Sequence, residues 1–330
     1  MRGIVLAIVF VLAVVVLAVA PFVGMHAIPV EALWRGGDPE RIKILWDLRI
    51  PRVCVAFLAG AGLATSGMAF QAMFRNPLAT PFTLGVASGA SLGVAIHVRL
   101  GLAFSLLTVS GETWFALGGA LVSIALVYGL TRARRGFSTA TMLLAGVAIS
   151  FFFSSLILFL QYMSDFTQTF RMLRWVMGGL ESSVGFDSVF QILPCVVVGS
   201  AAVWCLAHEM NLLVTGDPLA TSRGVEVNRT KMLLFLAASL MVGAIVAACG
   251  PIGFVGLMAP HICRLLIGPD HRYLAPTTWL FGGLFLVLCD TLARTMMPPT
   301  ELPVGILTAL LGGPFFLWLL LGRTSELEGE

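Results

Sequence analysis

The chain has 330 residues, of which 58% are hydrophobic and only 11% are charged. Soluble domains carry about 25% charged residues, so this composition excludes an ordinary soluble domain, a disordered chain and a coiled coil. The net charge of +3 is too small to indicate nucleic acid or another acidic partner.

Long runs without charge mark the predicted membrane spans, because charged side chains are costly in a bilayer. The run Met232–Cys263 is too long for one span, and Gly250-Pro251-Ile252-Gly253 interrupts it. Proline suits the first turn of a helix, so we expect a span, a tight turn and a shorter helix over about 252–266. With that division, ten membrane helices are predicted in the runs Gly3–Val30, Val53–Phe74, Asn76–Val98, Thr113–Thr131, Gly136–Ser164, Ser188–His208, Met232–Cys263, Tyr273–Cys289 and Leu302–Gly322.

The first run has an alternative interpretation. Arg2 precedes an apolar stretch, and Ala18-Val19-Ala20 is typical of a signal-peptide cleavage site. The uncharged run is longer than the apolar region of a signal peptide, which has about 7–15 residues. We therefore expect a true first span, with a cleaved signal peptide as the alternative.

Basic residues indicate the orientation, since cytoplasmic loops are enriched in lysine and arginine. Arg132, Arg134 and Arg135, between the fourth and fifth spans, favour a cytoplasmic loop. An even number of spans then places both termini in the cytoplasm. The bias is weak, because the outer loop before Arg52 is also basic.

Two polar connections are long for helix hairpins: Ser164–Asp187 on the outer side and His208–Lys231 on the cytoplasmic side. In the second, Asp217-Pro218 is typical of an N-cap followed by proline at the first helical position. Gly224 can end a helix in a left-handed conformation. The sequence predicts a short helix over roughly 218–223 at the cytoplasmic surface, with a plain loop as the alternative.

Several kinds of chemistry are missing from the sequence. Neither of the two lysines, Lys43 and Lys231, ends a Walker A motif, so we expect no nucleotide site. The six cysteines form no CxxC pair and the five histidines are scattered, so we expect no metal site and no cofactor. Asp290 lies within a span, and Arg294 four residues later favours a structural ion pair over a proton relay. No arrangement of residues indicates an enzyme.

Motifs that cover nearly the whole chain in order remain to be explained. They include Arg49-Ile50-Pro51-Arg52, Arg75-Asn76-Pro77-Leu78-Ala79-Thr80-Pro81, Trp175-Val176-Met177-Gly178-Gly179, Gly250-Pro251-Ile252-Gly253-Phe254-Val255-Gly256-Leu257, Asp270-His271-Arg272 and Glu301-Leu302-Pro303-Val304-Gly305. With these motifs the chain resembles the FecCD family, the permeases of bacterial ABC importers for iron-siderophores, haem and vitamin B12. The resemblance implies an all-α polytopic fold with ten transmembrane helices per subunit, the type II ABC importer permease fold, as one domain over residues 1–330.

The resemblance also implies partners and a location. A homodimer with the pathway along its two-fold axis would work with two cytoplasmic ABC ATPases and a periplasmic or lipid-anchored binding protein, in the cytoplasmic (inner) membrane. The missing Walker A lysine agrees with a separate ATPase. The substrate would be a bulky metal chelate, with a ferric siderophore favoured by the number of such members, and vitamin B12 or haem as alternatives. A secondary transporter that needs no ATPase is the rival interpretation.

The resemblance gives roles to particular residues on each side of the membrane. Arg49, Arg52 and Arg294 match arginines that pair with glutamates of the binding protein. Headgroup anchoring is the alternative for these arginines, as is the pair with Asp290 for Arg294. The segment of about 216–224 matches the coupling helix that sits in a groove of the ATPase, with these docking residues: Gly216, Asp217, Ala220, Arg223 and Gly224.

A cytoplasmic gate is the last element that the resemblance implies. Asn76, Leu78, Thr139 and Ala140 match the residues of this constriction. Ala140 replaces a serine of the family pattern, which puts polar gating at that position in doubt. For Asn76, capping beside Pro77 is an equal alternative, because asparagine caps readily.

Overall fold

The computed structural model describes residues 2–24, 39–106, 109–133, 139–180, 185–298 and 300–327. Arg134 and Arg135, on which the predicted orientation partly depends, lie outside the described residues.

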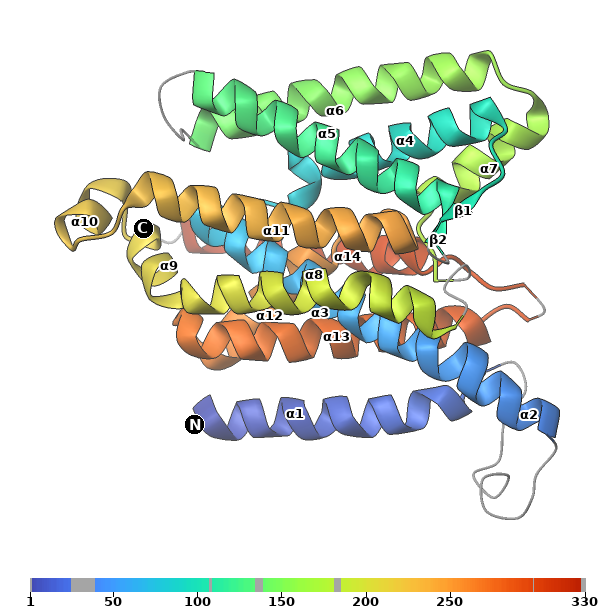
Figure 1. Cartoon of the computed structure of the whole chain (residues 1–330). Helices are drawn as coiled ribbons and strands as arrows, with labels where there is room; N and C mark the ends of the chain where they lie inside the picture. The colour runs from blue at the N-terminus through green and yellow to red at the C-terminus, as the bar shows by residue number, and fades with distance from the viewer. Residues whose placement is uncertain are drawn as a thin grey trace.

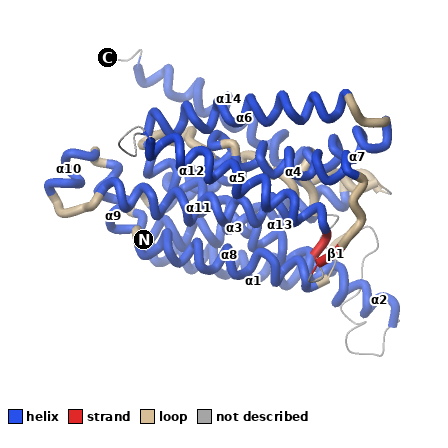
Figure 2. Tube along the Cα trace, turned by 45° about the horizontal axis from the view of Figure 1, so that its top comes forward, coloured by secondary structure: helices blue, strands red, loops and turns tan. Residues whose placement is uncertain are grey.

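The described chain is almost entirely helical (Figures 1 and 2). A two-stranded antiparallel sheet pairs Ser105 with Ser110 and Leu106 with Val109. The elements in chain order are α1 (Arg2–Val19), η1 (Ala20–Phe22), α2 (Pro39–Ile44), η3 (Leu45–Arg49), α3 (Ile50–Phe74), η4 (Pro81–Leu84), α4 (Val86–Leu100), β1 (Ser105–Leu106), β2 (Val109–Ser110), α5 (Gly111–Ala133), α6 (Thr139–Tyr162), α7 (Phe166–Val176), α8 (Phe186–Cys205), α9 (Ala207–Val214), α10 (Asp217–Ser222), α11 (Val227–Cys249), α12 (Val255–Ile267), α13 (His271–Thr295) and α14 (Val304–Leu327).

The long helices form one bundle with two distinct ends (Figure 1). At one end lie α2, the two strands and α7; we call it the α2 end. At the other lie α10, the start of α1 and the end of α14; we call it the α10 end. Helices α4, α5 and α6 lie on one side of the central helices, and α1 lies on the opposite side, packed against α13. Figure 2 shows the same two ends from a second direction.

Among the described residues, seven helical segments are long and apolar enough to cross a membrane. The helices α4, α12 and the first part of α14 are apolar but shorter. This confirms an all-α polytopic protein, whereas the count of ten spans stays a prediction. The seven longer segments are α1 with η1, the continuous run from α2 to α3, α5, α6, α8, α11 and α13.

The structure refines several predicted boundaries. The interruption after Cys249 is confirmed: α11 ends there, Gly250 has a φ of 66°, and the shorter helix α12 follows. The predicted third span starts late, because Pro77, Pro81 and Gly85 delay regular helix until Val86. The outer connection was predicted only as a polar segment, yet it contains the helix α7.

Helix α3 occupies the centre of the bundle and is buried along 94% of its most apolar stretch. Its glycines let neighbouring backbones approach closely. A Cβ atom at Gly60 would overlap the carbonyl oxygen of Gly282 in α13, and one at Gly67 would overlap that of Gly256 in α12. Small residues have this role in membrane bundles, where apolar burial does not drive helices together.

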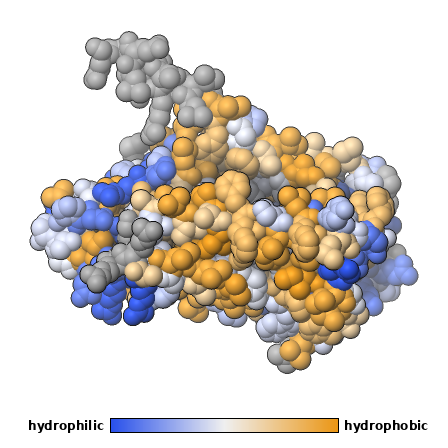
Figure 3. Space-filling view, turned by 90° about the horizontal axis from the view of Figure 1, so that it is seen from above, coloured by the Kyte–Doolittle hydropathy of each residue, from blue (hydrophilic) through white to orange (hydrophobic). Residues whose placement is uncertain are grey.

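The outside of the bundle is apolar between its ends. Figure 3 looks down on the side that carries α6 in Figure 1, and hydrophobic side chains gather across the middle of this face. Phe151, Phe152 and Leu158 of α6 are among the exposed apolar residues. An apolar surface of this extent needs a bilayer or another protein to cover it.

We predict that Gly67→Ala destabilises the bundle by about 1–3 kcal/mol, because the added methyl group forces α3 away from α12. The measurement is the midpoint of thermal unfolding in detergent. Gly118→Ala is the matched control, since Gly118 is exposed on α5 and has no atom within 4 Å of the added Cβ. A similar loss of stability in both variants would contradict the proposed role of the close contact.

Candidate functional sites at the two ends of the bundle

A cluster of buried charges lies at the α2 end. Arg52, in the first turn of α3, donates from Nε and Nη2 to Asp290 Oδ1 at 3.0 and 2.9 Å. Its Nη1 donates to Glu301 Oε2 at 2.7 Å. Asp290 Oδ2 also lies 3.2 Å from Arg294 Nε, which is the ion pair predicted from the sequence. The cluster therefore joins α3, α13 and the segment before α14.

Because its members are largely buried, this charge cluster stabilises the fold. Asp290 is 1% exposed and Arg294 is 4% exposed. Only 13% of the Arg52 side chain is exposed. Charges removed from water in this way are tolerated only when they are paired and hydrogen-bonded.

The charge cluster changes the interpretation of two predicted docking arginines. Arg52 and Arg294 already bind carboxylates of their own chain, and their guanidinium groups are largely covered. Docking at these two positions stays a prediction, which the burial of both side chains disfavours. Internal pairing, the alternative for Arg294, explains both positions.

Arg49, the third predicted docking residue, bonds to the backbone of a different segment. Its Nη1 donates to the backbone carbonyls of Pro21 and Phe22 at 3.2 and 3.4 Å, which ties η3 to η1. The residue remains half-buried. Of the three arginines, it has the greatest access to solvent.

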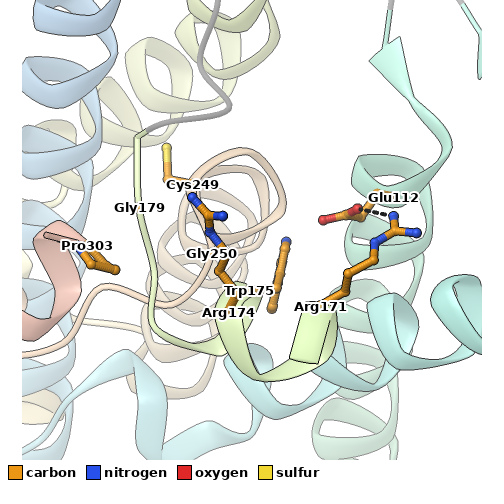
Figure 4. A pocket seen from close by; sticks show the side chains of 8 residues that line it. All are labelled: Glu112, Arg171, Arg174, Trp175, Gly179, Cys249, Gly250 and Pro303. Atoms are coloured by element: carbon orange, nitrogen blue, oxygen red, sulfur yellow. Dashed lines mark ion pairs between the residues drawn. The ribbon is translucent and has the colours of Figure 1, made fainter. Parts of the chain in front are cut away.

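A pocket of about 210 Å³ lies at the same end of the bundle (Figure 4). Arg174 and Trp175 extend from α7 into it, and Arg171 and Glu112 point toward one another across 3.7 Å. Among the described residues, the charged part of the lining consists of two arginines and one carboxylate. The sequence did not predict this site, because its lining comes from segments that are distant in the chain: Glu112, Arg171, Arg174, Trp175, Gly179, Cys249, Gly250 and Pro303.

At the α10 end, the predicted short helix is present as α10. Gly216 has a φ of 117° and is the N-cap, so the prediction of Asp217 as N-cap was wrong. The Asp217 carboxylate instead binds Lys231 Nζ at 2.6 Å and lies 3.8 Å from Arg75 Nη2. Gly224 has a φ of 86°, which confirms the predicted left-handed turn.

The outward face of α10 differs from the expected one. Ala220 is fully buried at 0% exposure, so its side chain packs inside the protein and cannot touch a docked partner. Arg223 and Gly224 are exposed. Leu219, which is not among the predicted docking residues, is 54% exposed and is the large apolar side chain on this surface.

The predicted gate residues lie in two segments at the α10 end. Asn76 and Leu78 follow α3, and the Leu78 backbone amide donates to Asn76 Oδ1 at 2.9 Å. This local bond matches the capping alternative for Asn76. Thr139 and Ala140 begin α6, and Thr139 Oγ1 lies 3.5 Å from Lys231 Nζ. Gating by these residues stays a prediction.

A larger cavity of about 600 Å³ also opens at the α10 end, lined in part by the Asp270-His271 motif. Asp270 accepts a hydrogen bond from Asn211 Nδ2 at 2.8 Å and caps α13 through the Arg272 amide. The bond from Asn211, with help from the Arg272 amide, lowers the pKa of Asp270 below its ordinary value. Arg2 of α1 lies 3.7 Å away. The motif thus ties α1 and α9 to α13.

We predict that Asp290→Asn lowers the free energy of unfolding by about 3–5 kcal/mol, because it leaves Arg52 and Arg294 buried without their shared carboxylate. The thermal unfolding midpoint in detergent measures this. Asp187→Asn, an exposed change in the first turn of α8, should cost less than about 1 kcal/mol. Equal shifts in the two variants would mean that the cluster does not stabilise the α2 end.

Known proteins resemble this chain over most of its length. A model of the FecCD transport family matches residues 6–322. The cobalamin import system permease protein BtuC of Halobacterium salinarum is 43% identical over 288 residues, covering 87% of this chain and 76% of that protein. The hemin transport system permease protein HmuU of Yersinia pestis is 38% identical over 311 residues, covering 93% of this chain and 92% of that protein.

A solved structure shares the fold. It is described as an inward-facing conformation of a transporter of metal-chelate type, with a TM-score of 0.88 and 30% sequence identity. The match covers 97% of this chain and 99% of that one. These findings confirm the family that the motifs indicated, whose members here are transport subunits and not enzymes. The chain therefore belongs to the FecCD transport family.

Proposed function

We propose that this chain is the membrane-spanning permease subunit of an ATP-driven ABC importer that moves a bulky metal chelate. The observation that carries the proposal is the family match over residues 6–322, which includes both ends of the bundle. The relatives named above are permeases of cobalamin and hemin import systems, and the solved structure is described as a metal-chelate type transporter. The sequence contains no Walker A lysine, so the ATPase would be a separate chain.

The substrate that we favour is a metal tetrapyrrole. Cobalamin and hemin, the cargoes in the names of the two relatives, are both of this class. The family resemblance favoured a ferric siderophore only because the family contains many such members. That cargo remains the second candidate, since it also is a bulky chelate.

We assign the α10 end to the cytoplasm and the α2 end to the outside. Helix α1 begins and α14 ends at the α10 end, so both termini would be cytoplasmic (Figure 1). The exposed Leu219 and Arg223 of α10 would then meet the groove of the ATPase. This assignment agrees with the positive-inside bias of the sequence.

A second copy of this chain would cover part of the apolar surface. Tyr162 and Phe166, where α6 leads into α7, are among the most exposed large side chains, and Phe170 extends the patch along α7. Aromatic residues are enriched in the buried parts of protein interfaces. A homodimer through this region, with the pathway between the copies, fits that exposure.

The proposed importer predicts ATP-dependent uptake in liposomes that contain this chain together with its ABC ATPase and its binding protein. Labelled cobalamin, hemin and a ferric siderophore are offered in parallel. We expect uptake of a tetrapyrrole that needs both ATP and the binding protein. Uptake of the ferric siderophore alone would overturn the tetrapyrrole assignment, and uptake driven by an ion gradient without ATP would overturn the importer.

For docking at the α2 end, we propose that Arg49 contacts a carboxylate of the binding protein, while Arg52 and Arg294 hold the surface beneath it. Arg49→Glu should weaken binding-protein affinity at least about tenfold, because like charges oppose each other at the contact. Titration calorimetry with the detergent-solubilised transporter measures the affinity. Arg99→Glu, which reverses a charge at the end of α4, is the matched control.

A further variant separates docking from folding. Arg49→Ala also loses the bonds to Pro21 and Phe22 but reverses no charge. We expect its affinity loss to be smaller than that of Arg49→Glu. Equal affinity of Arg49→Glu and the unaltered protein would refute docking at Arg49.

A further inference from the structure

We propose that Lys231 is a positioning residue that links the ATPase-docking helix α10 to the cytoplasmic gate, with Asp217 as the shared node. The inference rests on the proposed function and adds how movement of α10 would reach the gate segments. It comes from three contacts that converge at the start of α10.

The first contact is an ion pair under cover. Lys231, in the second turn of α11, is 1% exposed, although it is a long charged side chain. Its ammonium lies 2.6 Å from Asp217 Oδ2. A buried ammonium without a negatively charged partner is strongly unfavourable. The Lys231–Asp217 pair therefore opposes the separation of α10 from α11.

The second contact reaches the start of α6. The hydroxyl oxygen of Thr139 accepts from the same ammonium at 3.5 Å. A lysine ammonium has three donors, so it can hold a carboxylate and a hydroxyl at once. Because Thr139 belongs to one predicted gate segment, the position of that segment depends on where Asp217 holds the ammonium.

The third contact reaches the other gate segment. Arg75 Nη2 lies 3.8 Å from Asp217 Oδ1, the second oxygen of the same carboxylate. Arg75 is the left-handed C-cap of α3, with a φ of 50°, and directly precedes Asn76. This pair is more exposed than the lysine pair and contributes less, because solvent screens it.

A single carboxylate on α10 therefore binds two cations, the Lys231 ammonium, which also contacts Thr139, and the Arg75 guanidinium, whose residue directly precedes Asn76. When a bound ATPase displaces α10, Asp217 moves, and the ammonium and the guanidinium move with it. The buried Lys231 contact is the stronger of the two arms, since it is shorter and shielded from water. Without it, α10 would still follow the ATPase but Thr139 would lose its tie to α10.

The first test is Lys231→Met in the complete transporter in liposomes, which keeps most of the length of the side chain and removes its charge. We expect ATP hydrolysis to continue and the number of substrate molecules imported per ATP to fall about tenfold, within the range of couplings between distant sites. Arg229→Gln is the matched control, because Arg229 lies two residues before Lys231 on the same helix, is exposed and pairs with the exposed Glu226. Its import per ATP should stay at the unaltered value.

A second measurement follows the gate directly. Spin labels at Leu219 on α10 and at Ala140 on α6, each referenced to a label at Leu102, report both movements on addition of ATP. In Lys231→Met the Leu219 label should still move, and the Ala140 label should move less than in the unaltered transporter. A purely structural role for Lys231 would reduce both movements together.

Thr139→Val keeps the test decisive if Lys231→Met does not assemble, since it leaves the Lys231–Asp217 pair in place. Lowered import per ATP in Thr139→Val supports the link. Normal import per ATP in Lys231→Met, or in Thr139→Val when it is the variant that assembles, overturns it, as does an equal loss in Arg229→Gln. Absence of ATP-dependent import by the unaltered complex would instead refute the proposed function.

Discussion

The close approach of α3 to α12 and α13 is the contact on which the rest of the bundle depends. In hydrocarbon, apolar side chains gain nothing by leaving lipid for protein, so helices associate through close packing and polar contacts. Gly60 against Gly282 and Gly67 against Gly256 bring backbones together without intervening side chains. These contacts fix the position of α3 in the bundle and therefore of both its ends. Arg52 lies at one end and Arg75 at the other.

Those two arginines take part in the charge clusters at the bundle ends. Both clusters centre on one carboxylate, Asp290 at the α2 end and Asp217 at the α10 end. Each carboxylate binds two cations from different segments. Because the spans between them are apolar, these end clusters are where electrostatic interactions can fix one segment relative to another.

Local patterns in the sequence predicted more than distant pairings did. The break at Gly250, the short helix α10 and the Asp290–Arg294 pair were all predicted, because each depends on residues within a few positions of one another. The partner of Arg52 lies 238 residues away, so its pairing could not be read from spacing. Motif matching therefore placed Arg52 on the surface, where an arginine near a predicted helix end is usually solvated.

The α10 end illustrates a different limit. An Asp-Pro pair before a helix favours capping, yet the nearby buried Lys231 provides a stronger partner for Asp217 than an exposed backbone amide does. A lysine at this position becomes unusual only when its burial is known. The hydrophobic periodicity of the sequence does not reveal that a single lysine near the start of a helix is buried.

The two clusters differ in how far solvent reaches their central carboxylates, and this decides how easily each end of the bundle can move. Asp290 is shielded from water and held by buried arginines, which suits a surface that stays rigid while a partner docks on it. The Asp217 side chain is 39% exposed and pairs with both a buried lysine and a solvated arginine. Regions with few buried contacts open at lower free energy than a packed core. A shift of α10 therefore moves the buried Lys231 with it most directly, while the solvated contact with Arg75 transmits less of the movement.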